Sequence, residues 1–239
     1  MFFPSGALAA NCYVLGATRA GDVPVAGEQP GDCVVVDPGQ DAAGRLAETL
    51  DRNDLRPVAV LLTHGHLDHV ADAAKICHAF DVPAYLHQAD QYMLDDPLAG
   101  LSTQLRAGIS ALLGPDDDLT ALRPPDVRSP GDGEDLALAG LALFVDHVPG
   151  HTGGAVVYRV PAGPGNPAEQ LFTGDTLFAG SIGRTDLPGG STPQIMESIA
   201  TKLLTRLDDA VVLPGHGPST TIGAERADNP FLRPGGLAR

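Results

Sequence analysis

The sequence has no tryptophan, only three cysteines, and half as many basic as acidic residues. Without tryptophan, we expect neither an aromatic cage nor a base-stacking platform. The cysteines Cys12, Cys33 and Cys77 lie far apart and form no CxxC pair. This spacing argues against a disulfide scaffold and a thiolate zinc finger, and it favours a reducing cytosol. We expect Cys12 to act as a small buried hydrophobe.

The scarcity of basic residues excludes several classes of partner. The 15 Lys and Arg stand against 30 Asp and Glu, a formal net charge of −15. Such an excess argues against nucleic acid and against an anionic membrane surface, because both are held by clustered basic side chains. No apolar run reaches the roughly 18 residues of a membrane span. The first residues, MFFP, begin no secretory signal, so we expect a cytoplasmic protein.

Short apolar runs alternate with helical periodicity in both halves of the chain. Strands are predicted at 11–15, 33–36, 58–62, 84–86, 141–148, 155–160, 170–173 and 210–213, and helices at 42–52, 67–80, 101–113 and 193–207. Residues 115–133 are predicted to be a surface connection, and the acidic run 116–118 a solvated loop. The pattern predicts a layered α/β domain of two similar halves, spanning 1–239 as one domain.

The densest set of metal-binding side chains is the segment THGHLDH at residues 63–69, directly after the predicted strand 58–62. Imidazole and carboxylate ligands suit zinc, iron or manganese. His64 and His66 are two residues apart and point the same way in an extended chain. Asp68 and His69 begin the following helix and can face a second point. We therefore expect this segment to contribute ligands to two ions.

Three later strand ends each add one candidate ligand on a glycine-containing turn, where the backbone can approach a metal closely. His151 lies in VPGHTGG, Asp175 in FTGDTLF and His216 in LPGHG. The candidate metal ligands are therefore His64, His66, Asp68, His69, His151, Asp175 and His216. The remaining histidines, His78, His87 and His147, are predicted to be surface or core residues, with His147 also a candidate to orient a ligand.

The segments THGHLDH, VPGHTGG, FTGDTLF and LPGHG resemble those of the metallo-β-lactamase-fold hydrolase superfamily. Residues 180–191 (GSIGRTDLPGGS) and 228–231 (DNPF) are similar to its short bacterial glyoxalase II-like branch, the hydroxyacylglutathione hydrolases. The resemblance runs from about residue 11 to 231. It implies a four-layer αββα sandwich with the metal site at one edge. We expect no helical C-terminal extension of the kind that binds glutathione in longer glyoxalase II enzymes.

By this resemblance two divalent ions, zinc above all with iron or manganese as alternatives, occupy the site. One ion is held by His64, His66 and His151, the other by Asp68, His69 and His216, with Asp175 bridging. The implied reaction is hydrolysis of a small-molecule thioester by a hydroxide between the ions, which Asp68 also orients. A thiol has a pKa of about 8.5, so a thiolate can leave without a strong general acid.

The sequence leaves other classes of function open. Persulfide dioxygenases share this fold and use one iron, whose ligands here would be His64, His151 and Asp175. Nucleic-acid processing is disfavoured by the charge, a non-catalytic metal module by the complete ligand set, and β-lactam hydrolysis by the lack of an export signal. Arg184 is predicted either to support the metal cleft or meet an anionic substrate, or to form a buried loop-bracing pair with Asp186. Where the family commonly has glycine, Asp72 is predicted to be a solvated residue on a helix face.

Overall fold

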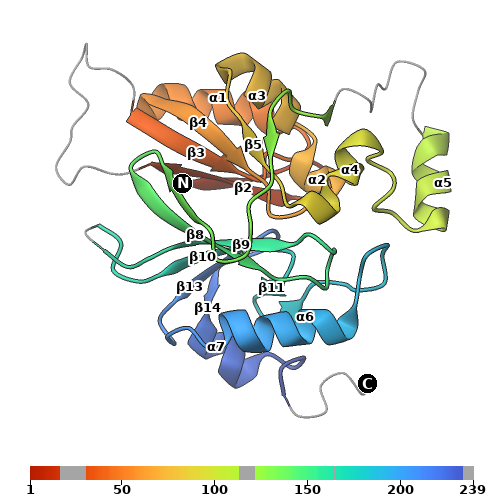
Figure 1. Cartoon of the computed structure of the whole chain (residues 1–239), viewed down its shortest axis with the longest axis vertical. Helices are drawn as coiled ribbons and strands as arrows, with labels where there is room; N and C mark the ends of the chain where they lie inside the picture. The colour runs from red at the N-terminus through yellow and green to blue at the C-terminus, as the bar shows by residue number, and fades with distance from the viewer. Residues whose placement is uncertain (17–30, 113–121, 164, 234–239) are drawn as a thin grey trace.

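Two six-stranded sheets lie face to face at the centre of the molecule, and helices cover their outer faces (Figure 1). The computed structural model describes residues 1–16, 31–112, 122–163 and 165–233. The first sheet has the order β1 (Phe2–Ser5), β2 (Ala10–Gly16), β3 (Gly31–Val36), β4 (Leu55–Leu61), β5 (Ala84–Tyr85) and β6 (Val127–Arg128). Strands β3 to β6 are parallel, and β1 and β2 add an antiparallel edge.

The second sheet also has six strands, all from the second half of the chain. Its order is β14 (Thr220–Thr221), β13 (Val211–Pro214), β10 (Gln170–Gly174), β9 (Val156–Val160), β8 (Leu141–His147) and β7 (Asp135–Leu138). Only β10 and β13 pair in parallel. A separate two-stranded ribbon consists of β11 (Leu177–Phe178) and β12 (Ser181–Ile182). The expected α/β architecture of two similar halves is confirmed.

The helices form the two outer layers. They are α1 (Ala42–Asn53), α2 (Leu67–Val70), α3 (Ala73–Phe80), α4 (Tyr92–Asp95), α5 (Thr103–Leu112), α6 (Thr192–Ser198) and α7 (Ile222–Asp228). Figure 1 shows α1 and α3 on the outside of the first sheet, and α6 and α7 on the outside of the second. A single π-helical turn, Ile199–Leu203, extends α6.

The central strands contain continuous apolar runs where both of their faces are buried. On β3, Val34 and Val36 point into the core between the sheets, whereas Cys33 and Val35 point into the core under α1 and α3. A third apolar cluster lies between the second sheet and α6, and it contains Ile195, Ile199 and Leu203. All three cysteines are free and buried, which confirms the expectation for Cys12. Three apolar cores between four layers hold the strand ends in place.

Several predicted boundaries were wrong. Strand β4 begins at Leu55, before Pro57, because a bulge opposite Cys33 and Val34 accommodates a residue that has no N–H. The predicted helix 101–113 is observed as Thr103–Leu112, and the helix 193–207 becomes α6 followed by the π-helical turn. The predicted loop 116–118 lies outside the described residues. None of the described helices combines the length and apolar character needed to cross a membrane.

The predicted helix 67–80 is also wrong, because it breaks at Asp72 into α2 and α3. Asp72 is not solvated but only 2% exposed. Its Oδ2 accepts a hydrogen bond of 2.9 Å from the Ala43 N–H, and its Oδ1 lies 2.6 Å from the Lys75 Nζ. The N-cap residue of α1, Asp41, makes no side-chain cap. Asp72 therefore caps α1 from another helix, and its carboxylate is a structural residue.

We expect Asp72→Ala to lower the free energy of unfolding by about 1–2 kcal/mol, the usual effect of losing a helix N-cap. Urea denaturation followed by circular dichroism measures this change. Asp51→Ala, at an exposed position of α1, is the matched control and should leave the denaturation midpoint unchanged. Equal midpoints for the two variants would contradict the capping role.

Candidate metal centre

Four loops, each following a strand, converge at one edge of the two sheets. The loop after β4 carries His64 and His66 and leads into α2, which carries Asp68 and His69. The loop after β8 carries His151. The parallel strands β10 and β13 end side by side, with Gly174 opposite Pro214, so that Asp175 and His216 follow at the same level. The Gly215 N–H donates to the Gly174 carbonyl over 2.8 Å and holds these two ends together.

All seven predicted ligands meet at this edge. Within the described residues, three overlapping groups have ligand atoms within 4.8 Å of one another, and they are His64, His66 and His151; His64, His69 and Asp175; and Asp68, His69 and His216. Asp175 lies between the first and last groups. Its Oδ2 is 3.7 Å from the His151 Nε2, and its Oδ1 is 3.4 Å from the His69 Nε2 and 3.7 Å from the His216 Nε2. The shared members make the seven residues one continuous cluster.

The open side of the cluster lies at Asp68 and His216, its two most exposed members. The side chains of His69 and His151 are 0% and 2% exposed, whereas those of Asp68 and His216 are 21% and 27% exposed. The Asp68 Oδ2 lies 3.2 Å from the His216 Nε2 on this open side. A substrate must therefore approach past Asp68 and His216.

The donor set fits metal ions. The His64 Nε2 and the Asp175 Oδ1 are buried and have no hydrogen-bond partner in the described part of the chain, an arrangement that is costly unless another group satisfies them. The Nδ1 of His66 lies 2.9 Å from the Nε2 of His151, with both rings packed edge to face. Lone pairs that converge from buried imidazoles and carboxylates are the arrangement that holds a divalent cation.

The protonation states also suit coordination. Burial and the neighbouring imidazoles lower the pKa of His64 well below its ordinary value, and burial lowers the pKa of His66 to about 4. Burial raises the pKa of Asp68, but His69 and His216 outweigh this effect and bring it below the ordinary value. At neutral pH both imidazoles are therefore neutral and Asp68 is ionised, the forms in which these groups bind metal.

Residues 6–216, which include the whole cluster, match the sequence profile of the Metallo-beta-lactamase superfamily. The chain belongs to the metallo-beta-lactamase superfamily. An uncharacterized protein of Mycobacterium tuberculosis is 48% identical over 240 residues, covering 99% of this chain and 98% of that protein. The hydroxyacylglutathione hydrolase GloC of Haemophilus influenzae is 36% identical over 202 residues, covering 84% of this chain and 87% of that enzyme. These findings confirm the resemblance drawn from the motifs.

Solved structures of the superfamily agree. The chain resembles the BLEG-1 B3 metallo-beta-lactamase with a TM-score of 0.77 and 35% identity, covering 98% of this chain and 99% of that one. It resembles TTHA1623, solved in a di-iron-bound form, with a TM-score of 0.74 and 34% identity, covering 97% of this chain and all of that one (100%). ETHE1 from Myxococcus xanthus, at 21% identity with a TM-score of 0.70, covering 97% of this chain and 83% of that one, shows the fold alone.

Backbone carbonyls bind the outer ring nitrogens of two ligand histidines. The His151 Nδ1 donates to the Arg184 carbonyl over 2.8 Å, and the His216 Nδ1 donates to the Leu8 carbonyl over 3.0 Å. Because the proton sits on Nδ1 in each ring, the Nε2 lone pair faces the cluster. These backbone carbonyls thus fix both tautomers.

Asp37, which the sequence patterns did not indicate, holds the outer ring nitrogens of two further ligands, His69 directly and His64 through Thr63. Asp37 is 1% exposed at the end of β3 and has positive φ, and its Oδ2 lies 3.0 Å from the His69 Nδ1. The same oxygen accepts from the Thr63 Oγ1 over 2.6 Å, and that hydroxyl lies 3.1 Å from the His64 Nδ1. A carboxylate only accepts hydrogen bonds, so the hydroxyl donates to it and accepts from His64. Its place at a strand end, like that of Asp175, was the available signal.

Asp90 was also missed, and it joins the two histidine loops. This carboxylate is 1% exposed and accepts hydrogen bonds from the Gly65 N–H, the Thr152 hydroxyl and the Gly154 N–H at 3.1, 2.6 and 2.7 Å. Gly65 lies between His64 and His66, and Thr152 follows His151. Asp90 therefore fixes the loop after β4 relative to the loop after β8, across the two halves of the fold.

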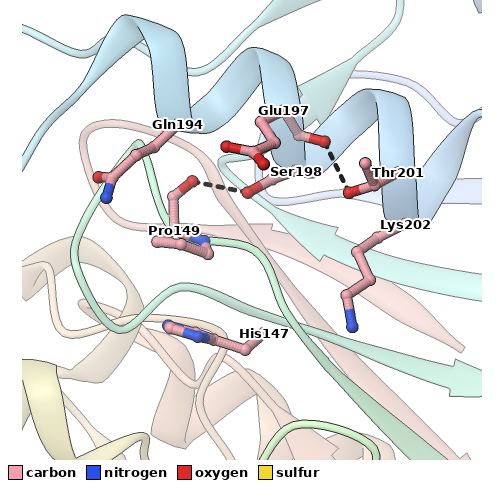
Figure 2. Close-up of a pocket in the computed structure, with 7 residues that line it drawn as sticks. All are labelled: His147, Pro149, Gln194, Glu197, Ser198, Thr201 and Lys202. Carbon is pink, nitrogen blue, oxygen red and sulfur yellow. Dashed lines mark hydrogen bonds between the residues drawn. The ribbon is translucent and has the colours of Figure 1, made fainter.

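The other predicted site residues lie outside the cluster. Arg184 contributes its carbonyl to the site, but its side chain is 54% exposed and pairs with the exposed Asp186, so the expected buried pair was wrong. His147 stacks on His87 and donates to the Gly153 carbonyl rather than to a ligand. It lines a pocket behind the His151 loop, where the Ser198 hydroxyl donates to the Pro149 carbonyl (Figure 2). This contact ties α6 to the His151 loop.

Proposed function

We propose that this protein hydrolyses a small-molecule thioester, with two divalent metal ions held by the seven clustered residues. The observation that carries the proposal is the continuous cluster, in which Asp175 reaches members of both outer groups. A mononuclear iron centre needs only His64, His151 and Asp175. Asp68, His69 and His216, whose ligand atoms lie within 4.8 Å of one another, could hold a second ion.

The two groups of three would each hold one ion, with Asp175 shared between them. When bound, such a pair supplies Lewis acidity and a water whose pKa is lowered toward neutrality. The protein contributes geometry, because Asp37, Arg184 and Leu8 hold the ligand rings by their outer nitrogens. Rigid support of this kind keeps reacting groups aligned without reorganisation during the reaction.

Asp68 has a second role in this proposal. It is ionised, lies on the open side and has an Oδ2 that is 3.2 Å from the His216 Nε2. It can accept a hydrogen bond from a water beside the cluster and turn one lone pair of that water toward an incoming carbonyl carbon. The thiolate product needs no protonation to leave, so the reaction does not require a strong general acid at the site.

The thioester assignment is supported by the similarity to GloC at 36% identity and by the segments 180–191 and 228–231. Arg184 is the candidate for an anionic substrate group, since its exposed guanidinium can exchange Asp186 for a substrate carboxylate. The similarity to BLEG-1 makes β-lactams the second substrate class to test.

The test is metal content together with substrate class. We expect two metal equivalents per chain in the purified protein and release of free thiol from S-lactoylglutathione or a related thioester. His69→Gln should lose metal and activity, whereas His78→Gln, at an exposed position of α3, is the matched control. One iron per chain with oxygen uptake on a persulfide, or hydrolysis of a β-lactam but no thioester by the two-metal protein, would overturn the proposal.

A further inference from the structure

The ribbon β11–β12 is attached to the metal centre at both ends but contributes no ligand of its own. Asp175 lies just before it and Arg184 just after it, and the Arg184 carbonyl accepts from the His151 Nδ1. The Gly183 N–H donates to the Thr176 carbonyl over 3.3 Å, which closes the base of the ribbon. A Cβ at Gly183 would overlap the Asp175 carbonyl. The ribbon is therefore held against the centre and cannot move independently of it.

Phe178, on this ribbon, lies at the open side of the cluster. Its ring centroid is 6.3 Å from that of His216, and the two planes are tilted by 58°. His216 is the most exposed of the five ligand histidines, and its side chain is 27% exposed. The neighbouring Leu177 is fully buried and anchors the ribbon in the core, whereas Phe178 is only partly buried. A substrate that reaches His216 therefore passes an aromatic ring.

Two buried residues of the C-terminal region hold the ribbon in this position. Glu225 is 4% exposed and accepts from the Gly180 N–H at 2.8 Å and from the Thr220 hydroxyl at 2.7 Å. Asn229 is 1% exposed, and its Nδ2 donates to the Ser181 carbonyl at 3.0 Å and to Glu225 at 2.8 Å. Gly180 lies in the turn of the ribbon, and Ser181 begins β12 opposite Phe178. We call Glu225 and Asn229 the ribbon latch.

The ribbon latch depends on the buried carboxylate of Glu225. Burying the Glu225 carboxylate is costly unless several donors satisfy it, and three donors do so here. The segment that these contacts hold, Gly180 and Ser181, is itself not buried. Because Ser181 pairs with Phe178 in the ribbon, this segment sets the backbone position of Phe178 next to His216.

We propose that Phe178, positioned by the ribbon latch, is a specificity-determining residue that selects thioesters with an apolar group beside the scissile carbonyl. This inference rests on the proposed function. Phe178 packs on the alkyl portion of the substrate and removes it from water, and the carbonyl is thereby brought to the ligands. The latch residues act only through the ring. Truncating the ring or releasing it should therefore weaken binding of long-chain substrates alone.

The experiment uses thioesters of N-acetylcysteamine that carry acetyl or hexanoyl groups, and the acetyl thioester of hexanethiol. We expect Phe178→Ala and Asn229→Ala each to raise KM about tenfold for one of the two substrates with a six-carbon chain, the hexanoyl thioester or the hexanethiol ester. This is the discrimination that one or two methylenes give in an apolar site. The affected substrate identifies whether the acyl or the thiol side packs on Phe178. kcat, the metal content and KM for acetyl-N-acetylcysteamine should stay within about twofold.

The double variant separates positioning from general destabilisation. Because both substitutions remove the same contact, their effects on KM should not add, and the double variant should match Phe178→Ala alone. Thr220→Val, which removes one donor to Glu225, is the milder variant of the latch, and Phe178→Leu should retain part of the selectivity. Leu207→Ala and Asn53→Ala are matched controls at exposed positions.

The outcomes distinguish the two proposals. If the wild-type protein hydrolyses acetyl-N-acetylcysteamine but Phe178→Ala leaves every KM unchanged, the specificity role is overturned and the hydrolase remains. If Asn229→Ala instead lowers kcat/KM equally for all substrates, and this loss adds to that of Phe178→Ala in the double variant, the latch acts on stability alone and its positioning role is overturned. Failure of the metal-loaded wild type to hydrolyse any thioester would overturn both.

Discussion

Asp175→Asn is expected to lower kcat/KM for thioester hydrolysis by about 10³-fold or more, the rate equivalent of several kcal/mol of transition-state stabilisation. The substitution keeps the shape of the side chain and removes its charge. Asp175 reaches His151 on one side and His69 and His216 on the other, at 3.4–3.7 Å. No other residue of the cluster contacts both outer groups through a carboxylate in this way.

The expected loss comes from the bound metal as well as from the reaction. The buried Asp175 Oδ1 has no hydrogen-bond partner in the described part of the chain, and an amide nitrogen in its place would oppose a cation. We therefore expect metal content to fall from two equivalents per chain to one or fewer. Elemental analysis and initial rates on the same preparation measure both effects. Asp51→Asn, at an exposed position of α1, is the matched control. A variant that keeps two ions and near wild-type activity would contradict the bridging role.

Asp37→Asn is expected to weaken metal binding by about 10–100-fold, the usual result of losing a carboxylate behind a ligating histidine. Asn tolerates the positive φ of this position, so the backbone is not strained. Its amide group, however, donates where the carboxylate accepted. Both carboxylate oxygens now accept, Oδ1 from the Thr63 N–H and Oδ2 from the Thr63 hydroxyl and His69, so one of these positions must receive the NH2 group. When the NH2 group takes the Oδ2 position, His69 can pair with it only through an unprotonated Nδ1, and its proton moves to Nε2, the atom that faces Asp68, Asp175 and His216.

The effect should spread to the other group through Thr63. Its hydroxyl now donates to Asp37 and lies 3.1 Å from the His64 Nδ1. If the hydroxyl accepts from an amide instead, it turns its proton toward His64 and disfavours the tautomer that ligates through Nε2. Competition with a chromophoric chelator measures both affinities, with the exposed Asp41→Asn as control because it also has positive φ. Loss of affinity in one group only would show that Thr63 does not relay the effect.

Much of the fold was predictable because its strands are buried on both faces. Continuous apolar runs such as Cys33–Val36 indicate such strands directly, and the ends of those strands locate the ligand loops. Element boundaries were less predictable where one residue changes the backbone. The predicted strand 58–62 begins after Pro57, whereas β4 begins at Leu55 and contains this proline beside a bulge. Asp72 interrupts an apparently continuous helix.

The residues that support the site were missed for one common reason. Asp37 follows the predicted strand 33–36, Asp72 lies within the predicted helix 67–80, and Asp90 lies in no predicted element or motif. Each is nevertheless a buried carboxylate whose partners are 25 to 64 residues away or lie on another element. A single aspartate has the same sequence appearance whether it is solvated or satisfied by distant donors. Only the folded chain shows which donors reach it.

By itself, the sequence determined the superfamily, the α/β class and the seven residues of the cluster, because local spacing and strand-end position specify those features. The tertiary structure decided which side of the cluster is open, which groups fix each imidazole, and that the Glu225–Asn229 latch places Phe178 beside His216. These features depend on contacts between segments far apart in the chain. Their geometry exists only once the two sheets have packed and their loops have met at one edge.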